Sequence, residues 1–152
     1  VADHCIPIDP WFLVENTNTG YFVRLARAIN DKRPVNVTQK VIELTKSIGG
    51  NNVGVLGVAY KPNVDDCRET PAAPLVKTLQ KANLNVKYHD PYVRQWSVER
   101  INKINELVAW ADIVVQVMGH NCYKGMKSSS TLIDTCGLLH QSDVLNLILP
   151  PS

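Results

Sequence analysis

The chain has 152 residues, of which 45% are hydrophobic and 20% charged, and its formal net charge is +2. This composition is typical of a globular domain, and no apolar run approaches the roughly 20 residues that span a bilayer, which disfavours a membrane protein. The small net charge and the dispersed Lys and Arg give no support to a nucleic-acid partner.

Cysteine usage indicates a reducing environment. The four cysteines lie far apart and form no CxxC pair. This spacing disfavours both a zinc site and a disulfide framework. We therefore expect a cytoplasmic protein.

The first feature along the chain is a thiol and a carboxylate four residues apart, Cys5 and Asp9. Neither an initiator Met nor a signal peptide precedes them. A site that begins at residue 5 is therefore expected to depend on an upstream part of the protein.

Two apolar runs at helical spacing follow, over residues 22–29 and 37–48. Pro34 lies between them and is predicted to end or kink the first helix near residues 31–33. An apolar stripe on helices outside the main domain needs a partner surface, and a second copy of the chain is the simplest one. We expect a homodimer through this region.

A glycine pair, Gly49 and Gly50, is predicted to close the second helix. It is also the expected domain boundary. The chain would then divide into a helical segment, residues 1–48, and a second domain, residues 49–152.

The second domain alternates strands and helices. The expected strands are residues 53–59, 84–88, 113–118, 132–134 and 144–147, and the expected helices are residues 71–79, which Thr70 caps and Pro71 begins, and 104–111. This order predicts an α/β fold in which a parallel, Rossmann-like sheet is flanked by helices.

Ligands of such sheets bind beyond the carboxyl ends of the strands, so the loop after the first strand is the expected site. This loop lacks the three glycines of a dinucleotide fingerprint but carries Lys61 and Arg68. Both could meet phosphate oxygens. Equally, both could pair locally with Asp65, Asp66 and Glu69.

Three segments carry a family resemblance: Cys5-Ile6-Pro7 with Asp9, residues 24–31 and residues 57–71. In this order they resemble the UDP-glucose/GDP-mannose dehydrogenase family over nearly the whole chain. Residues 4–12 and 61–71 are most similar to the branch that acts on UDP-N-acetyl-D-mannosamine. In the UDP-glucose branch a Lys usually stands where this chain has Ile8.

The resemblance implies an N-terminal NAD-binding domain, a central helical dimerisation region and a C-terminal domain that binds the nucleotide of a UDP-sugar. Residues 1–48 would hold the end of the catalytic loop and the dimerisation segment, and residues 49–152 the UDP-sugar-binding domain. Such enzymes oxidise a sugar C6 alcohol to a carboxylate in two hydride transfers to NAD. Since the NAD-binding part belongs upstream, this chain alone is expected to be inactive.

Residue roles also follow from the resemblance. Cys5 matches the nucleophile that forms a thiohemiacetal and then a thioester, although a lone Cys is more often simply buried. Asp9 would orient water or a helper Lys, or else cap a short helix. Tyr60 and Lys61 would contact the UDP-sugar, and Arg68 would reach toward NAD.

Two polar residues after later strands remain open. Asp90 stands where a dinucleotide fold binds a ribose hydroxyl, but without the glycine fingerprint a turn-forming role is preferred. His120 would lie near the nucleotide, or would be an ordinary histidine of a surface loop.

The sequence also departs from the family. Ala2 and Asp3 replace two glycines, and Cys136 stands where a basic residue is usual. Three alternatives therefore remain: a fragment of a UDP-glucose 6-dehydrogenase, a non-catalytic nucleotide-binding and dimerisation module, and, ranked last, an unrelated thiol enzyme.

Overall fold

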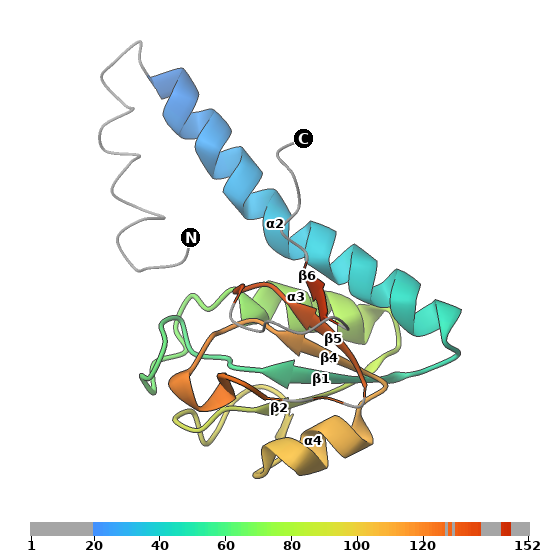
Figure 1. Ribbon diagram of the computed structural model, residues 1–152. Helices are drawn as coiled ribbons and strands as arrows, with labels where there is room; N and C mark the ends of the chain where they lie inside the picture. The colour runs from blue at the N-terminus through green and yellow to red at the C-terminus, as the bar shows by residue number, and fades with distance from the viewer. Residues whose placement is uncertain (1–19, 127, 129, 138–143, 147–152) are drawn as a thin grey trace.

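The computed structural model describes residues 20–126, 128, 130–137 and 144–146, the last three by their backbone alone. Within them a parallel sheet has helices on both faces (Figure 1). Its strands lie in the order β3-β2-β1-β4-β5-β6. The predicted Rossmann-like fold is confirmed. The strands are β1 Asn52–Leu56, β2 Asn85–His89, β3 Glu99–Arg100, β4 Ile113–Gln116, β5 Thr131–Asp134 and β6 Val144–Asn146; the helices are α2 Gly20–Ser47, α3 Ala72–Lys81, α4 Ile104–Trp110 and the 3-10 turn η1 Asn121–Tyr123.

The sheet is built around β1, which pairs in parallel with β2 on one side and β4 on the other. Every residue of β4 is buried. A strand covered on both faces reads as a continuous apolar run, which is why both central strands were predictable. The two-residue strand β3 was not predicted, since so short a segment has no period of its own.

Each face of the sheet has its own core. On one face α2 and α3 contribute Val41, Leu75 and Leu79 to a cluster with the alternate residues of the strands. On the other face α4 contributes Leu107 and Val108. Helices on both faces leave the loops at the carboxyl ends of the strands free to form a site.

The start of α3 agrees with the predicted cap. Pro71 has helical dihedral angles, φ −64° and ψ −16°. The hydroxyl oxygen of Thr70 accepts a hydrogen bond from the backbone N–H of Ala72 at 3.2 Å. Thr70 therefore satisfies one of the N–H groups that an α-helix leaves unpaired at its start.

Of the two predicted effects of Pro34, ending the helix is wrong, whereas a kink stays a prediction. The helix α2 runs without interruption through Pro34 from Gly20 to Ser47. A proline inside a helix removes one backbone hydrogen bond and costs about 3 kcal/mol. A helix of 28 residues whose second half packs on α3 can bear that cost.

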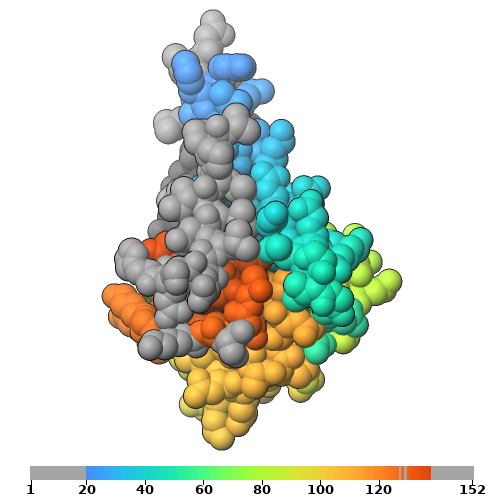
Figure 2. Space-filling model, turned by 45° about the vertical axis from the view of Figure 1, so that its right-hand side comes forward, coloured from blue at the N-terminus to red at the C-terminus, as the bar shows by residue number. Residues whose placement is uncertain are grey.

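The two halves of α2 differ in their surroundings. Val37, Val41 and Thr45 are buried against the sheet domain. The preceding half projects away from it (Figures 1 and 2) and leaves Phe22 78% exposed. The α2 helix ends before Gly49, which has a φ of +66°. The division at residues 48 and 49 stays a prediction, since the second half of α2 shares the core.

Among the described residues, none of the helices is both long and apolar enough to cross a membrane.

Candidate functional site

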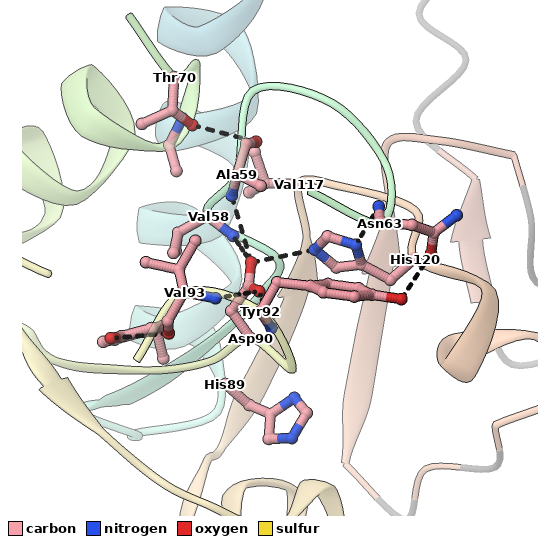
Figure 3. Close-up of polar contacts among 12 residues, drawn as sticks. Val58, Ala59, Asn63, Thr70, His89, Asp90, Tyr92, Val93, Val117 and His120 are labelled. Carbon is pink, nitrogen blue, oxygen red and sulfur yellow. Dashed lines mark hydrogen bonds and ion pairs between the residues drawn. The ribbon is translucent and has the colours of Figure 1, made fainter. Parts of the chain in front are cut away.

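The candidate site lies where β1, β2 and β4 end. Parallel strands present their carboxyl ends at one edge of the sheet, so the segments that follow these three strands meet there. Figure 3 shows the backbone after β1 and after β2 and the His120 side chain after β4 converging on one carboxylate, Asp90.

Asp90 is fully buried directly after β2. Its Oδ1 accepts hydrogen bonds from the backbone N–H groups of Tyr92 at 2.8 Å and Val93 at 2.9 Å. Its Oδ2 accepts from the backbone of Val58 at 2.8 Å and Ala59 at 3.2 Å. The carboxylate therefore joins the turn after β2 to the loop after β1.

A fifth hydrogen bond reaches Asp90 from a side chain. His120 Nε2 lies 3.0 Å from Asp90 Oδ2. Burial alone would raise the pKa of Asp90, but the hydrogen bonds from His120 and from the backbone of Val93, Val58 and Tyr92 outweigh it and lower the pKa to about 2. Asp90 is therefore charged at neutral pH.

The preferred interpretation of Asp90 as a turn former is confirmed by its bonds to Tyr92 and Val93. The sequence did not indicate the bonds to Val58 and Ala59. In a dinucleotide fold, backbone N–H groups after the first strand face a pyrophosphate, and the acid after the second strand binds a ribose. Here these groups bind each other, so the described residues do not fit NAD at this position.

The glycine Gly57 permits this arrangement at the end of β1. It has a φ of +77°, in the region that favours glycine. A Cβ there would lie 2.5 Å from the carbonyl oxygen of Met118. The backbones after β1 and β4 therefore approach too closely for any side chain.

The predicted substrate-binding residues Tyr60 and Lys61 open the loop after β1. Both are half-buried. The Lys61 Nζ lies 5.4 Å from the centroid of the Tyr60 ring. The backbone N–H of Tyr60 donates to the Asp66 carbonyl at 2.9 Å and closes the loop on itself.

The third predicted substrate-binding residue, His120, is fully buried. The alternative of a surface-loop histidine is therefore wrong. Its Nδ1 accepts a hydrogen bond from the backbone N–H of Asn63 at 2.8 Å. The structure thus brings His120 together with the loop of Lys61 and places it behind that loop.

Arg68, predicted to reach toward NAD, binds a neighbour instead. Its Nε donates to both carboxylate oxygens of Asp66 at 3.0 Å, and its Nη2 also contacts Asp66. The hydrogen bond and the charge of Asp66 raise the pKa of Arg68. Local pairing, one of the two alternatives, is present for Arg68, while its side chain is 79% exposed and accessible to a ligand.

Other predicted residues add less. Cys5 and Asp9 lie outside the described residues. Cys136, which replaces a basic residue, directs its thiol at the carbonyl oxygen of Val117, with Sγ 3.3 Å away.

Sequence reasoning missed two buried aromatic residues beside the site, His89 and Tyr123. The Tyr123 hydroxyl donates to the His89 carbonyl at 2.9 Å, and His89 Nδ1 lies 3.0 Å from the same hydroxyl oxygen. Burial is the main cause that raises the pKa of Tyr123. No local pattern could have revealed this pair, because its members lie 34 residues apart.

Comparison with known proteins gives consistent matches. A profile described as the UDP binding domain of the UDP-glucose/GDP-mannose dehydrogenase family matches residues 54–141. The chain is 36% identical over 151 residues to the UDP-N-acetyl-D-mannosamine dehydrogenase of Methanocaldococcus jannaschii, which covers 96% of this chain and 35% of the relative. A protein of the same name from Campylobacter jejuni is 33% identical, with 87% and 35% covered.

Solved structures agree with these relatives. A UDP-D-ManNAc dehydrogenase from Pyrococcus horikoshii superposes with a TM-score of 0.80 at 27% identity, covering 97% of this chain and 37% of that chain. A UDP-N-acetyl-mannosamine dehydrogenase from S. aureus gives 0.78 at 29% identity, covering 95% and 37%. The chain spans about a third of the length of these proteins.

Proposed function

The chain belongs to the UDP-glucose/GDP-mannose dehydrogenase family, and from that premise we propose that it is the central and C-terminal part of an NAD-dependent UDP-N-acetyl-D-mannosamine dehydrogenase. A relative carrying that name is 36% identical to it over 151 residues. The part of the reaction that this chain would contribute is recognition of the UDP-sugar, together with the Cys5 nucleophile and Asp9.

The position of Lys61 is the observation that carries the proposal. Lys61 follows the central strand β1 at the carboxyl edge of the sheet, where ligands of parallel sheets bind. Its loop is closed by the Tyr60 to Asp66 hydrogen bond and is held from behind by His120. An ammonium group fixed at such an edge suits the negatively charged diphosphate of a UDP-sugar.

NAD would be bound mainly by a part of the protein outside the described residues. The five hydrogen bonds of Asp90 leave no carboxylate for a ribose at the end of β2. Arg68 is the residue that we propose for contact with NAD, because its side chain is 79% exposed and its guanidinium group is held by Asp66. No step of hydride transfer is assigned to the described residues.

A homodimer through α2 is part of the proposal. Phe22, Leu25 and Ile29 are exposed by 78%, 45% and 50%, and their spacing places them on one side of the helix. Val37 and Val41, which the sheet domain covers, lie about a third of a turn away around α2 and at least about 12 Å further along it. The core of the same chain therefore cannot cover both stripes, and a second copy supplies a matching apolar surface.

Calorimetric titration of the chain tests the nucleotide specificity. UDP, UDP-N-acetyl-D-mannosamine, UDP-glucose and GDP are added separately, and the heats are compared. Selective binding of UDP and of its N-acetylmannosamine derivative is expected. Equal or absent heats for all four ligands would contradict the proposed binding function.

The role of Lys61 is tested by Lys61→Ala in the same titration. A charge-assisted hydrogen bond contributes about 1.5–3 kcal/mol, so its loss should weaken UDP binding about 10- to 100-fold. Lys81→Ala is the matched control, because Lys81 ends α3 in an exposed position. Similar affinities of the two variants would remove Lys61 from the site.

A further inference from the structure

The protonation state of His120 follows from its two hydrogen bonds. The backbone N–H of Asn63 can only donate, so His120 Nδ1 accepts and carries no proton. The ring proton is then on Nε2 and is donated to Asp90 Oδ2 at 3.0 Å (Figure 3). His120 is therefore a neutral imidazole with its proton on Nε2. Its Nδ1 binds the loop after β1, and its Nε2 binds the turn after β2.

The Asp90 end of this connection is rigid. Four backbone N–H groups besides His120 hold the carboxylate. The rings of Tyr92 and Tyr123 pack beside the imidazole, with centroids 5.2 Å and 5.5 Å from it. A ring fixed by its neighbours and by a buried carboxylate can impose its position on whatever its other nitrogen binds.

Its other nitrogen binds Asn63, two residues after Lys61. Asn63 has a φ of +61°, in the left-handed region, which Asn adopts more readily than most other residues with a side chain. Its side-chain oxygen accepts from the backbone N–H of Asn121 at 3.1 Å and lies 3.4 Å from the Tyr92 hydroxyl. The left-handed residue that turns the Lys61 loop is therefore set from the segment after β4.

We propose that His120 is a positioning residue, which holds the Lys61 loop in its binding conformation through Nδ1 and does not itself touch the UDP-sugar. Its complete burial keeps the imidazole behind the loop. A loop ordered in advance loses less conformational entropy when a ligand binds, so affinity rises. The inference rests on the proposed role of Lys61 in binding the diphosphate.

Two substitutions of His120 test the roles of its two ring nitrogens separately. In His120→Asn the amide oxygen can replace Nδ1 as acceptor for Asn63, while the bond to Asp90 is lost. In His120→Gln the amide nitrogen can replace Nε2 as donor to Asp90, while the acceptor for Asn63 is lost. Each substitution removes the imidazole ring and one of its two hydrogen bonds, so both variants should lose a similar amount of stability.

Three quantities are measured for both variants: thermal stability, the amide hydrogen-exchange rate of Asn63, and UDP affinity. Both variants should lose similar stability. Only His120→Gln should raise the exchange rate of Asn63 and weaken UDP binding, each by about tenfold. If both variants lose affinity equally, or neither loses it, His120 is structural and the proposal is wrong.

A measurement on the unsubstituted chain covers the case in which a variant fails to fold. Nitrogen-15 NMR of the imidazole should show Nδ1 without a proton and coupled to the Asn63 amide. A protonated Nδ1 would overturn the proposal. If the chain binds no UDP, the proposed function fails by itself, while the exchange rate of Asn63 still decides whether His120 holds the loop.

Discussion

The Asp90 carboxylate occupies the backbone N–H groups that bind a nucleotide phosphate in a dinucleotide fold. These N–H groups belong to Val58 and Ala59, which follow the first strand. A nucleotide phosphate would need donors of this kind. The sheet thus has a Rossmann-like topology, but at the place where such sheets usually bind a nucleotide, Asp90 connects the loop after β1 to the turn after β2. In the proposed function, nucleotide binding then depends on side chains outside that position, above all Lys61.

Acid should destabilise the chain through Asp90. The pKa of Asp90 is lowered from 3.8 to about 2 by folding, so its contribution to stability is complete above about pH 4 and is lost as the pH falls toward 2. A shift of this size corresponds to about 2 kcal/mol. Urea denaturation between pH 5 and pH 2 should show this loss in the natural chain and not in Asp90→Asn.

The Asp90→Asn variant should also be less stable at pH 7 by about 3 kcal/mol, because an amide cannot accept all five donors. Asp65→Asn is the control, since Asp65 is an exposed carboxyl group of the neighbouring loop. It should leave both the stability and its pH dependence nearly unchanged. If the free energy of unfolding changes with pH in the same way in the chain with and without the Asp90 carboxyl group, another group is responsible for the pH dependence.

At the scale of elements, the backbones that follow β1 and β4 approach each other closely at Gly57. Replacement of this glycine should therefore destabilise the fold. In Gly57→Ala the Cβ would meet the Met118 carbonyl oxygen, and φ would stay at +77°. The two effects together should lower the free energy of unfolding by about 3 kcal/mol.

Gly49→Ala separates strain from collision. Gly49 also has a positive φ, +66°, but an added Cβ would meet nothing within 4 Å. The expected loss is about 1 kcal/mol, measured by urea denaturation. If both alanine variants lose the same stability, the close approach of the two backbones is not what requires glycine at residue 57.

The exposed stripe of α2 predicts the oligomeric state. Replacing Phe22 and Leu25 by Glu should convert a dimer into a monomer, because two charges would be desolvated in an apolar interface. Sedimentation equilibrium measures the mass. Val35→Glu is the control, since Val35 is 52% exposed but lies outside the stripe. A natural chain that sediments as a monomer would contradict the interface.

Local signals made most elements predictable. The apolar runs of β1 and β4 and the Thr70 cap of α3 depend on residues within the elements themselves. The effect of Pro34 was not predictable, because its cost is offset by packing of the second half of α2 on α3. The burial of His120 was equally hidden, since its partner Asp90 lies 30 residues earlier in the chain.

At the scale of the whole molecule, the residues of the proposed function are distributed along the sequence. Lys61 and Arg68 belong to the described sheet domain, whereas Cys5 and Asp9 precede α2. The helix between them has 28 residues, which at 1.5 Å per residue is about 42 Å long. The proposed site therefore includes residues outside the sheet domain, and the chain itself spans about a third of the length of its relatives.

A chimera tests the proposed reaction. The part of the M. jannaschii relative that this chain matches, 35% of its length at 36% identity, is replaced by this chain. The chimera should form NADH faster with UDP-N-acetyl-D-mannosamine than with UDP-glucose. Cys5→Ala should lower the rate at least about 100-fold, because the thiol is the proposed nucleophile. Cys122→Ala, at an exposed cysteine, should leave it unchanged. A folded, UDP-binding chimera that is equally active with and without the Cys5 thiol would exclude covalent catalysis by Cys5.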